Sequence, residues 1–275
     1  MTTMLTPAPA TGTNSPAKDL RVTQWRVLNS EWTKLRSLRS TVFTLLTAFA
    51  LMIGLGAMFA AISAGAAAGF DPGTTAISTS LTGTFFAQLA IGVLGVLLIT
   101  GEYSTGMIRA SLTVVPRRLP VLWGKLAVFA GTVFVTMLVA SVISFLVGQA
   151  LLSEKHMQAT LSDPGAVRAV VGAALYLTVA GMTALALGAL LRNTAAAITT
   201  FVAVFFVIPP LSNLLPTSLT DHFVQYLPSN AGAVLLDGTY GVANAMAPWP
   251  GFAVMCGYAL LLVGCAAWRL RRADA

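Results

Sequence analysis

The chain has 275 residues, of which 56% are hydrophobic and only 9% are charged, and its net charge is +7. A soluble protein of this length would carry charges on its exposed helix faces, so this composition excludes an ordinary soluble domain. Six stretches without Asp, Glu, Lys or Arg are each long enough to cross a bilayer, which takes about 20 helical residues. They are residues 40–70, 72–101, 126–153, 169–191, 193–220 and 238–268. The sequence therefore predicts an all-α integral membrane protein with six transmembrane helices.

Lysine and arginine lie almost entirely in alternate gaps between these stretches. Of the 16 basic residues, 14 lie before residue 40, between residues 102 and 125, at Arg192 or after residue 268. Short cytoplasmic loops retain Lys and Arg, so we expect both termini in the cytoplasm. The same cations face anionic lipid headgroups. Since no charged patch exists away from these membrane flanks, we expect the lipid bilayer, and no nucleic acid, as a partner.

The segment before the first stretch has two parts. Residues 1–20 are rich in Thr, Pro and Ala and predict a disordered cytoplasmic tail. Residues 21–39 carry apolar side chains at helical spacing, and a basic polar face lies opposite them. The apolar residues are Val22, Trp25, Leu28, Trp32 and Leu35. An amphipathic helix of this kind suits the headgroup region of a membrane. The alternative is a soluble helix packed on another domain, but the chain has no other cytoplasmic domain large enough.

The spans themselves are predicted in chain order within a transmembrane domain of residues 40–268, which a cytoplasmic tail of residues 269–275 follows. We expect them at residues 41–62, 81–100, 126–152, 169–191, 195–208 and 249–268. Only three residues join the fourth and fifth spans, so these two helices should form a tight antiparallel pair. Asn193 or Thr194 can cap the start of the fifth helix.

The external side is predicted to contain residues 63–80, 153–168 and 211–248. Pro209 and Pro210 should break the fifth helix, because proline lacks a backbone N–H. Residues 219–236 could form short helices that are interrupted at Pro228. Non-helical backbone at membrane depth must be buried in protein or beside water, so we expect a partly re-entrant external segment before the last helix.

Catalytic chemistry is not indicated by any motif in the sequence. The chain has no phosphate-binding loop, no nucleophile elbow and no metal-ligand spacing, so we expect no enzymatic activity, no cofactor and no metal. The spans carry neutral polar side chains, most of which should form interhelical hydrogen bonds. A few could line a transport pathway, for which the candidates are Gln88, Ser144, Gln149 and Thr183. Close helix packing is expected at Gly54, Gly56, Gly92 and Gly95.

The most varied stretch lies between the second and third spans. Residues 101–109 read GEYSTGMIR, and Val115, Pro116, Arg117 and Arg118 lead toward the third span. Ile108 and Leu112 share one helical face, so a short helix beneath the membrane could dock on a partner. A solvated loop is the alternative that composition favours. Glu102 and Arg109 are too far apart to pair, so each should anchor the segment to another helix or to a partner.

Three segments resemble the membrane subunit, or permease, of ABC-2-type ABC transporters of the actinobacterial bacitracin-resistance-like kind. They are residues 28–37 (LNSEWTKLRS), residues 101–109 with Pro116, Arg117 and Arg118, and residues 226–232 (YLPSNAG). The resemblance implies a connecting helix at 22–38, a coupling helix around 103–113, and separate ATPase subunits. A second permease copy or a paralogue is also implied. The implied coupling residues are Glu102, Tyr103, Thr105, Gly106, Ile108, Arg109 and Leu112.

The function that these expectations favour is that of an exporter permease in the plasma membrane, driven by an ATPase on another chain. An ion-coupled secondary transporter is one alternative, although charged residues are scarce in the spans and no inverted repeat is evident. A noncatalytic membrane scaffold or sensor is the other.

Overall fold

The computed structural model of the chain describes residues 24–65, 74–104, 118–153, 158–212, 214, 223–236 and 245–272. These residues form helices and turns and contain no strand. Six helices among them are long and apolar enough to cross a membrane: Arg39–Gly65, Ala76–Tyr103, Pro120–Ser153, Ala166–Leu191, Thr194–Ser212 and Pro248–Arg272. The prediction of an all-α protein with six such helices is confirmed.

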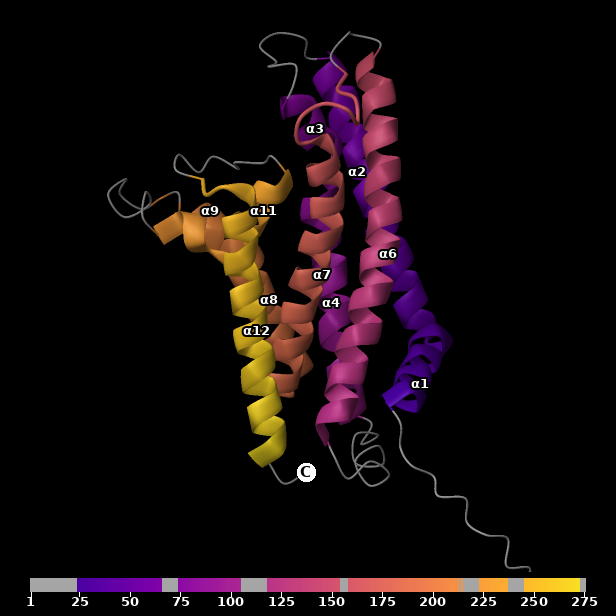
Figure 1. Cartoon of the computed structure of the whole chain (residues 1–275), viewed down its shortest axis with the longest axis vertical. Coiled ribbons are helices and arrows are strands. Elements are labelled where there is room, and N and C mark those ends of the chain that lie inside the picture. Colours follow the sequence, from indigo (N-terminus) through magenta and orange to yellow (C-terminus); the bar gives the residue numbers. More distant parts are fainter. Residues whose placement is uncertain are drawn as a thin grey trace, which may run out of the picture.

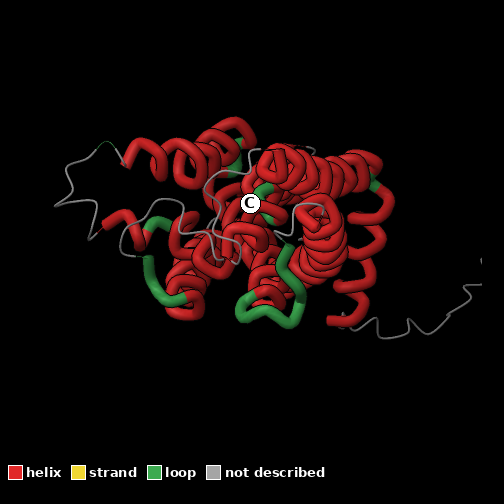
Figure 2. Tube along the Cα trace, turned by 90° about the horizontal axis from the view of Figure 1, so that it is seen from above, coloured by secondary structure: helices red, strands yellow, loops and turns green. Residues whose placement is uncertain are grey.

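The individual helices are labelled in Figure 1, where the long ones run side by side along the longest axis of the molecule. The first half contains α1 (Gln24–Ser37), α2 (Arg39–Gly65), α3 (Thr74–Ser80), α4 (Gly83–Ser104) and α6 (Arg118–Ser153). The second half contains α7 (Ala166–Leu191), α8 (Thr194–Val202), the π-helical η1 (Ala203–Val207), α9 (Ile208–Ser212), the short η2 (Val224–Tyr226), α11 (Pro228–Ala233), η3 (Val234–Leu236) and α12 (Pro248–Arg272). Figure 2 shows from above that these helices pack into one bundle.

Helix α7 is the centre of the bundle and packs against α4, α6 and α12. Its most apolar 18-residue window is 78% buried, compared with 22% for α2. Many of its residues are Ala or Gly, which lets neighbouring backbones approach closely. A Cβ atom added to Gly95 of α4 would lie only 2.5 Å from the Gly181 carbonyl oxygen of α7. Gly54 of α2 is exposed and its position is open, so the expectation of close packing there is wrong within this chain.

Helix α3 lies in a segment that was expected to be an external loop, and that expectation is wrong for residues 74–80. Polar side chains of α6 hold α3 in place. Ser144 Oγ donates to the Ser80 carbonyl oxygen at 2.7 Å, and Gln149 Nε2 donates to the Ala76 carbonyl oxygen at 3.1 Å. The bond from Ser144 satisfies a carbonyl at the C-terminal end of a short helix, whereas the Ala76 carbonyl also accepts from Ser80 Oγ at 2.9 Å. Neither partner can be identified from local sequence.

The fifth span continues through Pro209 and Pro210 to Ser212, so the expected break at these prolines is wrong. A π-helical turn precedes them, in which the Ile208 N–H bonds to the Ala203 carbonyl. The two prolines then follow in α9, which continues η1 without a break, so the helix accommodates them although they supply no N–H groups. Within residues 223–236 the expected short helices are present, and the break between them lies at Leu227, because η2 ends at Tyr226 and α11 begins at Pro228. Helix α11 packs mainly against α12, next to η1 and η2, and η3 packs against α7 and α12.

Candidate functional site

Four charged side chains from three helices meet where α4 ends, at the end of the bundle that carries α1 and the last turn of α12. Lys125 of α6 donates through Nζ to Glu31 Oε2 of α1 at 2.7 Å and to Glu102 Oε1 of α4 at 2.9 Å. Lys34 Nζ of α1 donates to Glu31 Oε1 at 2.8 Å and lies 3.4 Å from Glu102 Oε1. We call Glu31, Lys34, Glu102 and Lys125 the ion cluster. Its two carboxylates and two ammonium groups balance in charge.

The ion cluster is largely removed from water. The side chains of Glu31, Glu102 and Lys125 are 5%, 9% and 3% exposed, whereas that of Lys34 is 33% exposed. Buried charges are stable only when they are paired and hydrogen-bonded. Lys125 meets this condition by contacting one carboxylate of α1 and one of α4. The buried core of the cluster therefore joins three helices.

Helical periodicity places Glu31 inside the protein. Val27, Glu31 and Leu35 follow one another at four-residue intervals and are the buried residues of α1. A Cβ atom added to Gly124 of α6 would lie 2.9 Å from Val27, so the absence of a side chain there lets α1 approach α6.

Of the five residues expected to form the apolar face of this helix, Val22 lies outside the described residues, and the other four are divided between two surroundings. Leu35 is buried and Leu28 is half-buried, whereas Trp25 and Trp32 are 69% and 48% exposed. Much of the surface of both tryptophan side chains therefore lies outside the helix bundle. Exposed tryptophans on a basic helix are suited to membrane headgroups.

The neighbouring charges keep both Glu31 and Lys34 ionised. Burial alone would raise the pKa of Glu31, but Lys125 and then Lys34 hold this pKa below its ordinary value. Burial alone would lower the pKa of Lys34, but Glu31 and Glu102 raise it above its ordinary value. Both groups are therefore ionised throughout the neutral range.

The stability that Glu31 and Lys34 contribute should not change with pH near neutrality. The stabilisation from Glu31 is present above the ordinary Glu pKa of about 4.3 and is lost as the pH falls through the lowered folded-state value. The stabilisation from Lys34 is present below the ordinary Lys pKa of about 10.4, and it is lost as the pH rises through the raised folded-state pKa of Lys34. We expect the difference in melting temperature between the wild type and Glu31→Gln to stay constant from about pH 6 to pH 9. A difference that disappears within this range would contradict the assignment.

A second set of contacts joins the end of α4 to the turn between α7 and α8. The Arg192 guanidinium lies 5.2 Å from the centroid of the Tyr103 ring, and Thr194 Oγ1 donates to Thr100 Oγ1 at 2.9 Å. Arg192 has a φ of 54°, an unusual conformation for a residue with a side chain, and it ends α7. Asn193 then caps α8 by accepting from the Ala196 N–H at 3.0 Å. The last turn of α4 thus contacts α1, α6, α7 and α8.

The predicted coupling residues are only partly within the described structure. Glu102 belongs to the ion cluster and Tyr103 contacts Arg192. The remaining predicted coupling residues lie outside the described residues; they are Thr105, Gly106, Ile108, Arg109 and Leu112.

The four candidate pathway residues lie in different surroundings. Ser144 and Gln149 bond to α3, and Thr183 donates to the Val179 carbonyl of its own helix. Gln88 Oε1 accepts a hydrogen bond from the Tyr176 hydroxyl. The structure therefore does not bring the four together.

Sequence reasoning missed Glu31, Lys34 and Lys125 as members of one site. A signal was present: Glu31 and Glu102 are the only carboxylates in the predicted cytoplasmic segments between residues 21 and 272. Isolated acidic residues among so many basic ones are natural candidates for ion pairs. Within the described residues, no group of three His, Cys, Asp or Glu side chains could hold a metal ion.

Comparison with known proteins adds one finding. A family model described as ABC-2 family transporter protein matches residues 27–210, about two thirds of the chain. The matched range contains the whole ion cluster, the first four spans and all but the last two residues of the fifth. No curated protein matches the chain.

Proposed function

Because the chain belongs to the ABC-2 family of transporter proteins, we propose that it is the permease subunit of an exporter, coupled to a separate ATPase through residues 103–113. Family membership and the six apolar helices make it a multi-pass plasma-membrane protein and the permease component of a transporter. Members of this family are membrane subunits that work with ABC ATPases and are generally not catalytic themselves. The narrower bacitracin-resistance-like kind stays a prediction.

The observation that carries the coupling proposal is the pair of contacts from Lys125 to Glu31 and Glu102. The segment between α4 and α6 leaves α4 two residues after Glu102 and enters α6 seven residues before Lys125. The buried ion pair between Glu102 and Lys125 therefore joins the two helices from which this segment extends. A force applied to the segment by an ATPase would act on α4 and α6 together, and Glu31 would transmit it to α1. Because packed helices move as units, the contacts of Tyr103 and Thr100 would extend the movement to α7 and α8.

The orientation and the partners belong to the same proposal. The Lys and Arg distribution supports a cytoplasmic location for both termini, and hence for the ion cluster. A second permease copy or a paralogue would complete the pathway. Helix α2 exposes large apolar side chains along its length, which lipid or that second subunit would cover; they include Val42, Phe43, Leu46, Met58 and Ile62.

The test of this function uses the full chain with and without its ATPase subunit in lipid vesicles. We expect no ATP hydrolysis by the chain alone and ATP-dependent transport by the complex. Arg109→Ala should reduce the coupled ATPase activity several-fold, because the proposed docking segment would lose a cation. The control is Arg271→Ala, which removes an exposed arginine from the last turn of α12. Hydrolysis by the chain alone, or equal effects of the two substitutions, would contradict the proposal.

A further inference from the structure

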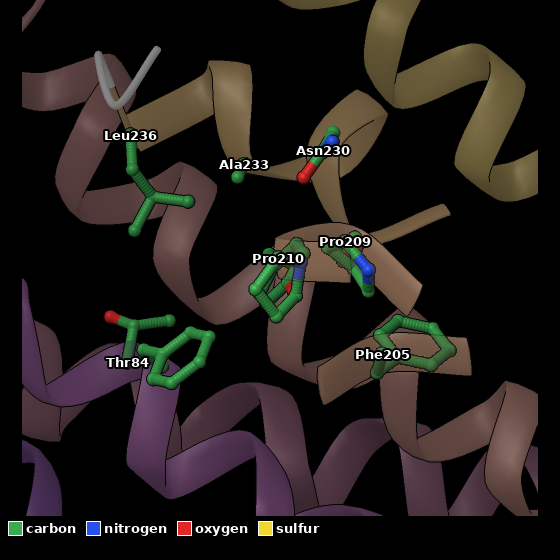
Figure 3. A pocket seen from close by; sticks show the side chains of 10 residues that line it. Thr84, Phe205, Pro209, Pro210, Asn230, Ala233 and Leu236 are labelled. Atoms are coloured by element: carbon green, nitrogen blue, oxygen red, sulfur yellow. The ribbon is translucent and has the colours of Figure 1, made fainter. Parts of the chain in front are cut away.

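A cavity of about 190 Å³ lies in the half of the bundle away from the ion cluster, close to the start of α4 and to α9. Its walls come from α4, α7, η1, α9, α11 and η3. Figure 3 shows Phe205, Pro209, Pro210 and Leu236 around it, which makes most of its surface apolar. None of its ten lining residues is charged. This surface is suited to an uncharged occupant.

Three polar side-chain atoms at or next to this cavity are buried and have no partner within the described part of the chain. They are Thr84 Oγ1, Ser229 Oγ and Gln88 Nε2. Thr84 and Ser229 line the cavity. Gln88 lies one helical turn from Thr84 and bonds to Tyr176, another lining residue. An unpaired buried polar group destabilises a protein, so three of them in one place call for a partner from outside the described residues.

Two residues that line the cavity, Phe205 and Asn230, also carry hydrogen-bond acceptors. The Phe205 carbonyl has no N–H donor four or five residues ahead, because Pro209 and Pro210 occupy those positions. Asn230 Nδ2 donates to the Val224 carbonyl at 3.0 Å, which fixes the orientation of the carboxamide. In Figure 3 the Asn230 oxygen lies on the side of Pro209 and Pro210. The residues of the walls therefore carry both unpartnered hydroxyl groups and hydrogen-bond acceptors, next to a mostly apolar surface.

We propose that this cavity binds an uncharged, mostly apolar molecule that carries one hydrogen-bonding group, such as an alkylphenol, and thereby selects the cargo of the exporter. The size agrees with the ring of such a molecule, because a cavity of about 150 Å³ accommodates benzene. The cavity is partly open, so an alkyl chain can extend beyond it. A charged ligand would have to lose its hydration without finding an opposite charge among the lining residues. The role in cargo selection rests on the function proposed above, whereas the binding itself does not.

The binding test uses the purified full chain in lipid nanodiscs, with Cys256→Ala and Cys265→Ala to remove the native thiols. Ala233→Cys introduces a thiol in the cavity wall, and its reaction with N-ethylmaleimide is timed. We expect 4-butylphenol to slow this reaction at a concentration roughly fivefold lower than butylbenzene requires, since one hydrogen bond contributes about 1 kcal/mol. The anion 4-butylbenzoate should give no protection. A thiol introduced by Ser162→Cys lies in an exposed turn, and its reaction rate should be the same with and without each of the three probe molecules.

The hydrogen-bonding part of the proposal has its own variants. Thr84→Val with Ser229→Ala should remove the advantage of 4-butylphenol over butylbenzene while leaving protection by butylbenzene intact. The matched control is Thr200→Val, because the Thr200 hydroxyl donates within its own helix and does not line the cavity. Absence of protection by both probes, equal protection by both in the parent protein, or protection by the benzoate would each overturn the proposal.

The role in cargo selection is tested in the complex with the ATPase subunit. We expect 4-butylphenol to raise ATP hydrolysis, and Ala233→Leu, which fills the cavity, to abolish this response. Ala253→Leu on the exposed face of α12 is the control and should respond normally. A complex that transports cargo but responds alike in both variants would overturn cargo selection at this cavity. Because the labelling test contains no ATPase, its outcome does not depend on whether coupling occurs.

Discussion

Replacing Lys125 by methionine should destabilise the protein by about 3–5 kcal/mol, because two buried carboxylates would then lack their shared cation. Lys125 lies 2.7 Å and 2.9 Å from the carboxylates of Glu31 and Glu102 and is 3% exposed. The measurement is thermal unfolding of the full chain in detergent. Lys34→Met is the control: the Lys34 side chain is 33% exposed, and ion pairs in contact with water contribute only about 0–1 kcal/mol.

A second substitution separates charge imbalance from loss of volume. Glu102→Gln combined with Lys125→Met leaves Glu31 paired with Lys34 at 2.8 Å and restores neutrality. We expect this double variant to recover most of the stability that Lys125→Met loses, because a neutral replacement of a buried pair is often tolerated. Equal losses for Lys125→Met and Lys34→Met, or no recovery in the double variant, would show that the cluster is not organised around Lys125.

Gly83→Ala should also destabilise the protein, by about 1–3 kcal/mol, because the added methyl group has no room. A Cβ atom at this position would lie 2.1 Å from the Met52 carbonyl oxygen and 2.7 Å from the Met52 Cα atom. These are backbone atoms of α2, so relief requires the two helices to separate. The same substitution at Gly131 of α6 meets no atom within 4 Å and is the matched control.

The two glycine variants should therefore change stability in opposite directions. Alanine is favoured over glycine in a helix by about 0.5–1 kcal/mol, so Gly131→Ala should raise the melting temperature slightly. Gly83→Ala should lower it. Equal melting temperatures for the two variants would contradict the close contact between α2 and α4.

The six spans could be predicted from the sequence because a bilayer imposes a length and a composition on each helix. The extent of α6 could not, since this helix begins at Arg118, eight residues before the apolar stretch. Helix α3 lies within the charge-free stretch 72–101, but its helical structure could not be predicted because hydrogen bonds from Ser144 and Gln149, 64 or more residues away, hold it in place. The effect of the prolines could not be predicted because it depends on their position: Pro209 and Pro210 follow a π-helical turn within a continuing helix. Pro228 lies at the start of α11, where no N–H is needed.

Of the four residues in the ion cluster, only Glu102 could be predicted from the sequence. Glu102 was identified because it lies at the end of a span, where an unpaired carboxylate is costly. Its partners depend on how α1 lies against α6, and Glu31 is 94 residues away from Lys125 in sequence. The periodicity of the first helix was assigned from Trp25 and Trp32, whereas the bundle buries Val27 and Glu31 instead. Tryptophans on a helix at a membrane surface do not distinguish contact with lipid from contact with protein.

The most direct test of the coupling claim is the ATPase activity of the complex that contains the Glu102→Gln, Lys125→Met double variant. This variant should fold with near-normal stability but lack the buried link from α4 to α6 and α1. We expect it to assemble with the ATPase subunit and to show transport-stimulated hydrolysis reduced several-fold, while the Lys34→Met complex stays close to normal. A stable double variant with fully coupled transport would contradict the account.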